Sequence, residues 1–384
     1  MFEKEKQENR DQILEFEEGK QIPDRDWDGS VSFYPRYLQI EHTTRCNAKC
    51  IMCNHLYTGN RGAKDIDLDV LYALEDILKY AETVMLNGDG EPFLYRDIDK
   101  SLALFGKYEV KVGMNTNFTV VPEQLWNDMG HAFSFLNISC DGAEKDLYES
   151  IRKGLCFEDF KANLEKLNKV APHLKKNMDC VLMRQNIGDM ENLVRFAADY
   201  GFSSVRFHSL GINPIIGNEK DAPDLYPHYL MEQAQKAANA ARERGIRIQL
   251  PRVQSPEGGD AARDLEKIHG EEKEAEKRIR KAEAYHEVLS RQYLGSSVRE
   301  EDFTRELFDY GDLCRWAVER CYIDLNGNLT TCCYDVSHRY GSLKEQTFEE
   351  IWNGPLYKKL RLKMREGKLP KWCGECQWLK NPEF

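Results

Sequence analysis

The sequence has no long apolar run, no secretory signal and no excess of basic residues. No stretch of the 384 residues approaches the ~20 consecutive apolar residues that a membrane-spanning helix requires. The charged segment 1–12 lacks the apolar core of a signal peptide. The formal net charge is −11, and no basic cluster of the kind that follows nucleic-acid phosphates is evident. These absences predict a cytoplasmic protein that uses neither a membrane nor nucleic acid.

Cysteine, by contrast, is abundant. The chain has 12 cysteines, and because disulfides are rare in the cytoplasm, grouped cysteines indicate bound metal. Nine of them form two groups: Cys46, Cys50 and Cys53, and then Cys314, Cys321, Cys332, Cys333, Cys373 and Cys376. The other three, Cys140, Cys156 and Cys180, lie in or beside apolar segments and are expected to be core residues.

Apolar runs alternate with amphipathic helical patterns from about residue 37 to 252. This alternation is typical of an α/β fold in which helices cover a parallel sheet, and seven strands favour an open or partial barrel. The expected strands are Tyr37–His42, Thr83–Asn87, Val110–Asn115, Phe135–Cys140, Met178–Met183, Ser204–His208 and Ile246–Leu250. The expected helices are Asp69–Ala81, Pro122–Met129, Phe157–Val170, Asp189–Tyr200 and Leu225–Arg244.

The alternation stops between residues 253 and 310. A strong helical pattern, Glu271–Leu294, lies in this segment, and Gly295 provides a stop signal. The helix is either a solvated surface element or a lid over substrate. The chain therefore divides into an N-terminal extension (1–36), a barrel (37–252), a helical connector or lid (253–310) and a C-terminal domain (311–384).

A hairpin is expected near the start of the C-terminal domain. Asn326–Gly327 lies between two short apolar runs, a strong signal for a two-residue turn. Counting outward from that turn places Cys321 opposite Cys332, with Cβ atoms roughly 4.5–5.5 Å apart. Cys333 then points to the opposite face of its strand, as a core thiol or a redox residue.

The first cysteine group has the spacing C-x3-C-x2-C and follows the first expected strand. A 4Fe–4S cluster normally takes four cysteines, so three would leave one iron open to a small molecule. The alternatives are three buried thiols or a structural zinc site completed by His42 or His55.

The loop TTRCNAKCIMCNH resembles the cysteine loop of the radical S-adenosylmethionine (SAM) superfamily, although Met52 stands where the family often has an aromatic residue. The resemblance implies a partial (β/α)6, TIM-like barrel with a small C-terminal α+β iron–sulfur domain. It implies a 4Fe–4S cluster on Cys46, Cys50 and Cys53 whose open iron binds SAM. Reductive cleavage of SAM would give a 5′-deoxyadenosyl radical that abstracts a substrate hydrogen.

Further motifs extend the resemblance over residues 37 to 252. The string NGDGEP after the second strand looks like the family's glycine-rich motif. Its members Gly88, Gly90 and Glu91 are therefore expected at the methionine end of SAM. Strand ends in the family also face the cofactor, which assigns Asn117 and Ser139 to the ribose side and Arg184 to the carboxylate.

The second cysteine group resembles the SPASM or twitch domain, which holds auxiliary clusters. The resemblance implies one auxiliary 4Fe–4S cluster, two clusters in all, because no further cysteines follow the final C-x2-C. The expected ligands of the auxiliary cluster are Cys314, Cys332, Cys373 and Cys376. The hairpin register leaves Cys321 as an alternative to Cys314, and a zinc ribbon as an alternative to the whole cluster.

These features predict a radical SAM oxidoreductase that receives electrons from a flavodoxin or ferredoxin. Only about 36 residues precede the first strand, too few for a peptide-recognition domain, which favours a small polar substrate such as a sugar, aminocyclitol or nucleoside. Modification of a ribosomally made peptide is the alternative, and a non-enzymatic zinc scaffold is the second. His208, Tyr334 and Asp335 are candidates for the general acid or base.

Overall fold

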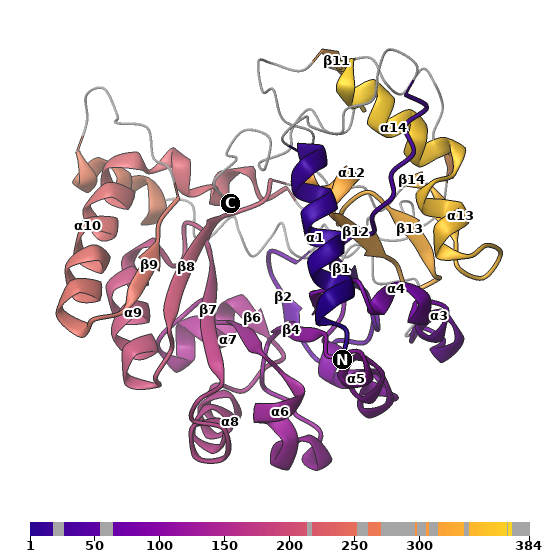
Figure 1. The fold of residues 1–384 in the computed structure, drawn as a ribbon. Helices are drawn as coiled ribbons and strands as arrows, with labels where there is room; N and C mark the ends of the chain where they lie inside the picture. The colour runs from indigo at the N-terminus through magenta and orange to yellow at the C-terminus, as the bar shows by residue number, and fades with distance from the viewer. Residues whose placement is uncertain are drawn as a thin grey trace.

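The computed structural model contains one continuous ten-stranded sheet, ordered β15-β13-β12-β1-β3-β4-β5-β7-β8-β9 (Figure 1). The structure describes residues 1–17, 27–53, 64–212, 217–251, 260–269, 296–297, 305–306, 314–333, 338–366 and 368–370. The seven strands from β1 to β9 in this order are all parallel. The predicted α/β fold with a mostly parallel sheet is confirmed.

All seven expected barrel strands are present. In chain order the strands of the sheet are β1 (Tyr37–Ile40), β3 (Thr83–Leu86), β4 (Lys111–Thr116), β5 (Phe135–Ser139), β7 (Lys175–Leu182), β8 (Ser204–Ser209), β9 (Arg247–Gln249), β12 (Arg320–Ile323), β13 (Asn328–Thr330) and β15 (Gly341–Ser342). Within the described ranges, three short pairs lie outside this sheet: β2 (Lys49–Cys50) with β6 (Arg152–Lys153), β10 (Ser296–Ser297) with β14 (His338–Arg339), and β11 (Arg305–Glu306) with β16 (Lys368–Leu369).

The helices follow the expected order, with two differences. The α-helices are α1 (Glu3–Glu17), α3 (Leu68–Tyr72), α4 (Glu75–Leu78), α5 (Ile98–Lys107), α6 (Met129–Ala132), α7 (Lys145–Ile151), α8 (Phe157–Val170), α9 (Met190–Asp199), α10 (Pro227–Arg244), α12 (Arg315–Val318), α13 (Phe348–Trp352) and α14 (Pro355–Arg365). The helix expected over Asp69–Ala81 is broken into α3 and α4, and Glu123–Asp128 forms a 3-10 helix, η3. No described helix is both long and apolar enough to span a membrane.

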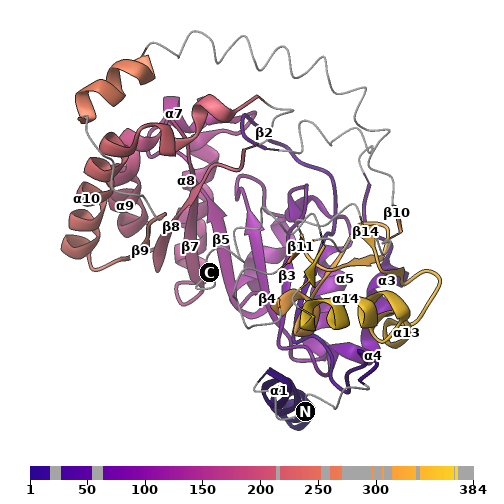
Figure 2. The same cartoon turned by 90° about the horizontal axis from the view of Figure 1, so that it is seen from above.

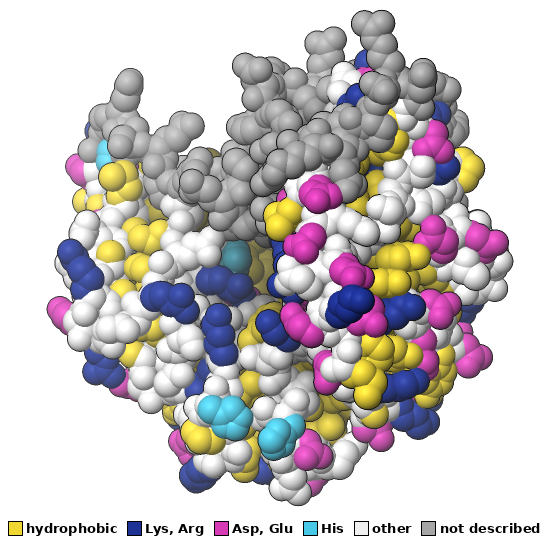
Figure 3. Space-filling model, viewed as in Figure 1, with side chains coloured by type: hydrophobic (Ala, Val, Ile, Leu, Met, Phe, Trp, Pro, Cys, Tyr) yellow, Lys and Arg dark blue, Asp and Glu magenta, His cyan; other side chains and the backbone are white. Residues whose placement is uncertain are grey.

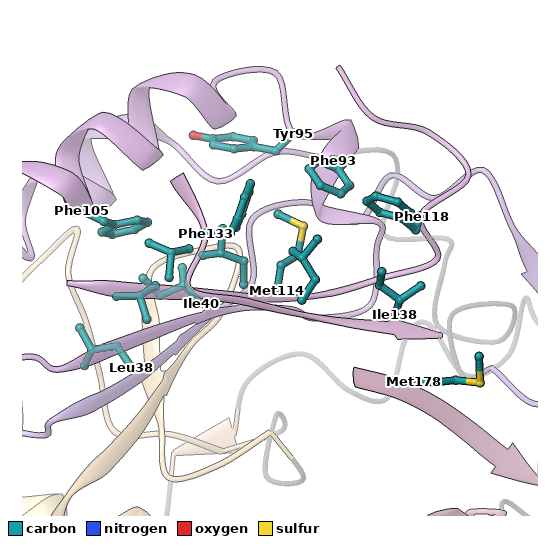
Figure 4. Close-up of a cluster of buried hydrophobic side chains, with 14 of the residues drawn as sticks. Leu38, Ile40, Phe93, Tyr95, Phe105, Met114, Phe118, Phe133, Ile138 and Met178 are labelled. Atoms are coloured by element: carbon teal, nitrogen blue, oxygen red, sulfur yellow. The ribbon is translucent and has the colours of Figure 1, made fainter. Parts of the chain in front are cut away.

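Burial alternates along the strands, so the two faces of the sheet differ. On β7, Met178, Cys180 and Leu182 are fully buried, while the alternate residues Asp179 and Val181 are partly exposed. The buried face is covered by helices, and Figure 4 shows Ile40, Met114 and other strand side chains meeting the rings of that core. The other face, which we call the open face, carries polar side chains toward the concave side of the sheet.

The C-terminal domain is joined to the barrel by backbone hydrogen bonding. Strand β12 pairs in parallel with β1, with Cys321 beside Leu38. β13 then pairs antiparallel with β12. The hairpin therefore extends the barrel sheet instead of forming a separate layer, as the orange strands beside β1 in Figure 1 show.

The expected two-residue turn in this hairpin is wrong. Tyr322 pairs with Thr330, Asp324 N donates to Asn328 O at 3.0 Å, and Asn328 N donates to Asp324 Oδ1 at 2.8 Å, so three residues form the loop. Gly327 adopts a φ of +83°, as the last residue of such a loop requires. The register is therefore shifted by one residue from the expected one. Such a shift reverses the face of every partner, so Cys321 is not opposite Cys332.

Residues 27–36, the described part of the N-terminal extension after α1, pack on the C-terminal segment. The indole of Trp352 donates to the carbonyl oxygen of Phe33 at 2.9 Å. The buried guanidinium of Arg361 donates to Gly29 O at 3.1 Å and lies 4.4 Å from the Trp352 ring. Figures 1 and 2 show α13 and α14 on the side of the molecule that holds the C-terminal strands, and Tyr357 of α14 donates to Thr330 O of β13 at 3.2 Å. Of the connector, residues 261–269 are helical, and the expected helix 271–294 lies outside the described residues.

Candidate functional site

The three cysteines of the first group lie on a loop that is anchored to a later part of the chain. Cys50 is in β2, and its partner across the β2–β6 pair is Arg152. Ile51 N donates to Ile151 O at 3.0 Å. Cys53 N donates to Cys50 O at 3.1 Å, which closes a tight turn between two of the cysteines. The loop is thus held where β1 ends, and its conformation depends on the segment after α7.

Burial governs the chemistry of these thiols. It raises the pKa of Cys46 to about 11, and it also raises that of Cys50, which is 7% exposed. A buried thiolate needs a nearby positive centre, which a bound iron cluster supplies. Among the described residues, no three His, Cys, Asp or Glu side chains lie close enough to hold a single metal ion. His42 packs in the core 4.9 Å from the Tyr95 ring, and His55 lies outside the described residues.

The glycines of NGDGEP allow backbone to approach backbone beside the cysteine loop. A Cβ at Gly90 would overlap the carbonyl oxygen of Thr43, and one at Gly88 would overlap the side chain of Glu41. Glu91 N donates to Arg45 O at 2.7 Å, one residue before Cys46. The cysteine loop and the glycine loop therefore form one unit, which fits a ligand bound to both.

Glu91 is buried and accepts three hydrogen bonds. Its Oε1 accepts from Phe93 N at 3.2 Å and Thr116 Oγ1 at 2.7 Å, and its Oε2 accepts from Asn117 N at 2.7 Å. Burial raises its pKa to about 7, against these bonds, which lower it. The carboxylate thus joins the ends of β3 and β4, and one acceptor direction is left for a ligand.

The other three expected cofactor residues occupy different surroundings. Asn117 donates from Nδ2 to Asn47 Oδ1 at 2.9 Å, so it joins the end of β4 to the cysteine loop. Ser139 is partly exposed at the end of β5. Arg184 is buried and pairs with Asp221 at 3.1 Å. Asn117 and Glu91 therefore lie beside the cysteine loop, whereas Arg184 anchors the segment before α10.

Sequence reasoning missed Glu41, which joins both halves of the site. Its Oε1 accepts from Asp89 N at 3.0 Å, in the glycine loop. Its Oε2 accepts from Leu325 N at 3.2 Å, in the β12–β13 turn. Glu41 is 2% exposed and follows the first apolar strand directly. A carboxylate directly after an apolar strand was the sequence feature that could have identified Glu41 as a site residue.

A charged cluster on the open face was also missed as a unit. Arg206 donates from Nε and Nη2 to the two carboxylate oxygens of Asp179, at 2.6 Å each. His208 Nε2 lies 3.1 Å from Asp179 Oδ1. Burial favours a raised pKa for Asp179, but the His208 bond and the Arg206 charge outweigh it and lower that pKa. We call these three residues the open-face cluster; only His208 was a sequence candidate.

A row of polar side chains lies between this cluster and the amino-terminal ends of the strands. Asn137 donates to Asn115 at 2.8 Å, Asn177 donates to Asn137 at 3.0 Å, and Ser204 donates to Asn177 at 2.9 Å. These residues share one register level across β4, β5, β7 and β8. Figure 3 shows Lys and Arg side chains gathered around the hollow of this face.

The second cysteine group is only partly described. Cys314 is partly buried just before α12, while Cys321 is fully buried on the helix-covered face. Cys333 is partly buried and follows β13 within a few residues. Cys373, Cys376, Tyr334 and Asp335 lie outside the described residues. The structure therefore gives Cys321 the surroundings of a core residue.

Two family models match the chain, one over each cysteine group. The radical SAM superfamily model covers residues 40–197, and the SPASM iron–sulfur cluster-binding domain covers residues 314–377. The protein is a radical SAM enzyme with a SPASM domain, and it uses 4Fe–4S clusters and SAM. It belongs to the superfamily that the sequence resembles.

Known proteins of this kind are similar over half of the chain or over most of it. An AdoMet-dependent heme synthase of Methanosarcina barkeri is 22% identical, with 90% of this chain and 89% of that protein covered. A GTP 3′,8-cyclase of Clostridium botulinum is 25% identical over 50% of this chain and 60% of its own length. SuiB of Streptococcus suis bound to SAM superposes with a TM-score of 0.59 and 17% identity, covering 92% and 72%. The peptide-bound anSMEcpe structure has a TM-score of 0.57 and 17% identity, covering 90% and 87%.

Proposed function

We propose that the enzyme abstracts a hydrogen atom from a small polar molecule bound on the open face. The catalytic cluster is held by Cys46, Cys50 and Cys53, and the loop Gly88–Glu91 binds the methionine end of SAM. When bound there, the cluster and SAM would supply the one-electron chemistry that makes a hydrogen-abstracting radical. The chain's own residues bind and orient the substrate and exclude water.

The open-face cluster is the observation that carries this proposal. Arg206, whose side chain is 29% exposed, is fixed by two bonds to Asp179 and keeps Nη1 for a substrate oxygen. The ring of His208 is 39% exposed. With Nε2 donating to Asp179, its Nδ1 is able to accept a proton. Charged donors on a half-exposed face suit hydroxyl or carboxylate groups better than apolar ones.

The position of the cluster also supports the proposal. Strand β12 of the C-terminal domain pairs with β1, and Arg320 of β12 lies 5.0 Å from the Tyr37 ring, on which Arg206 of β8 also acts electrostatically. We therefore infer that β8, β1 and the C-terminal domain border one volume. An auxiliary cluster on Cys314, Cys332, Cys373 and Cys376 would then lie in the domain that borders the substrate. That arrangement suits transfer of an electron from a substrate radical, and hence a net oxidation.

The test is cofactor cleavage stimulated by substrate. Arg206→Gln and His208→Asn should keep the slow formation of 5′-deoxyadenosine that occurs with reductant alone. Both should lose the additional formation caused by a protease-treated small-molecule filtrate of cell extract. Lys175→Gln, an exposed residue at the other end of β7, is the matched control and should respond as the wild type does. Equal stimulation of all variants would contradict the proposal.

A peptide substrate is the second candidate. SuiB bound to its precursor peptide SuiA and peptide-bound anSMEcpe share this fold over about nine-tenths of the chain. The same assay separates the two functions, because stimulation that disappears after protease treatment would favour a peptide and reject the small molecule.

A further inference from the structure

A buried arginine lies against the cysteine loop at Cys50. Arg152 is 7% exposed and faces Cys50 across the β2–β6 pair. Its Nη1 donates to Cys50 Sγ at 3.9 Å. Buried arginines are rare unless they are paired, so this cation needs an explanation.

The guanidinium is held between the thiol and a carboxylate. Its Nη2 lies 2.7 Å from Asp141 Oδ2, and Asp141 is fully buried. Asp141 Oδ1 accepts from Val181 N at 2.7 Å, which fixes the carboxylate at the edge of β7. The Nε of Arg152 has no hydrogen-bond partner among the described residues.

We propose that Arg152 raises the reduction potential of the cluster bound at Cys50 and that Asp141 limits the rise. This inference rests on the proposed assignment of Cys50 as a cluster ligand. Cluster potentials depend on net charge, on hydrogen bonds to the sulfurs and on burial, and Arg152 contributes to all three. An arginine carries its charge at every relevant pH, so the effect is permanent.

The step that Arg152 influences is a single electron transfer. A low-potential one-electron donor, such as a reduced ferredoxin or dithionite, is oxidised as the cluster gains one electron. No bond forms or breaks at this step, and no proton is needed. The negative charge of the cluster and its thiolates increases by one, and a cation 3.9 Å from a ligand sulfur stabilises that product more than the oxidised form.

The experiment is a potentiometric titration of the reconstituted enzyme, followed by the electron paramagnetic resonance signal of the reduced cluster without SAM. Arg152→Gln should lower the ratio of reduced to oxidised cluster at least tenfold at fixed potential, which is 59 mV for a one-electron couple. Asp141→Asn keeps the guanidinium and should shift the ratio in the opposite direction. Lys153→Gln, the exposed neighbour of Arg152, is the control and should titrate as the wild type does.

The proposal can still be tested if Arg152→Gln folds poorly. Arg152→Gln leaves Asp141 buried without its partner, so the double variant with Asp141→Asn removes both charges and should titrate between the two single variants. A wild-type potential in Arg152→Gln, or a potential in Asp141→Asn that does not rise, would overturn the inference. Cys50→Ala tests the underlying assignment separately: if that variant kept the catalytic cluster, the assignment would fail and not the electrostatic argument.

Discussion

Replacing Glu91 by Ala tests the construction of the cofactor loop. The substitution removes the acceptor of three hydrogen bonds and leaves Asn117 N, Phe93 N and Thr116 Oγ1 unpaired in a buried site. At 1–3 kcal/mol for each buried donor, with partial relaxation, the loss is about 3–5 kcal/mol. The variant also removes the cost of ionising a buried carboxyl group.

The ionisation cost makes the effect depend on pH. Burial raises the pKa of Glu91 from 4.5 to about 7, so the folded protein holds this proton more tightly than the unfolded chain does. The free energy of unfolding of the wild type therefore falls as pH rises from 4.5 to about 7 and is constant above that range. Relative to its value at low pH, it is lower by roughly 2 kcal/mol at about pH 6 and by roughly 3 kcal/mol at about pH 8.5. Glu91→Ala should cost about 1–3 kcal/mol at about pH 6, and roughly 1–1.5 kcal/mol less at about pH 8.5.

Denaturant unfolding of the cluster-free protein at the two pH values measures the stability change, and equilibrium dialysis of the reconstituted enzyme measures SAM binding. Because Glu91 holds the glycine loop to β4, the affinity for SAM should fall about tenfold to a hundredfold, or roughly 1.5–3 kcal/mol. Asn9→Ala is the control: it removes two hydrogen bonds to Tyr34 backbone, far along the chain, and should reduce stability without changing SAM affinity. Wild-type stability in Glu91→Ala would refute the hydrogen-bond argument, and wild-type affinity would leave Glu91 a purely structural role.

Three further predictions concern the clusters and the open face. Cys314→Ala should remove the auxiliary cluster and with it about half of the iron. Cys321→Ala should keep all of the iron and lose only about 1 kcal/mol of stability, because it is a small truncation in the core. Iron analysis and unfolding curves distinguish the two variants. Gly90→Ala should abolish SAM binding because its Cβ overlaps Thr43 O, which dialysis would contradict by showing normal affinity. Because the pKa of Asp179 is lowered in the folded protein, its ionised form stabilises the fold at pH values above 3.8, and this contribution is lost on acidification. In the cluster-free protein, Asp179→Asn should therefore make the free energy of unfolding depend less on pH in the acid range.

Much of the fold was predictable because it depends on local patterns. The barrel strands carry apolar residues on the face that the helices cover, and such local patterns follow from burial on one face of a sheet. The spacing of Cys46, Cys50 and Cys53 and the string NGDGEP are also local, and they predicted the superfamily that the family models confirm.

The remaining features depend on contacts between distant segments. A single extra loop residue at Gly327 changed the partner of Cys321, because register alternates faces with every residue. The contacts of Glu41 with Leu325 and of Arg152 with Cys50 join positions far apart in the chain, and no local pattern encodes them. The sequence by itself determined the class of enzyme through the spacing of its ligands. Only the tertiary structure decided which charges surround those ligands, since burial and pairing are properties of the packed chain.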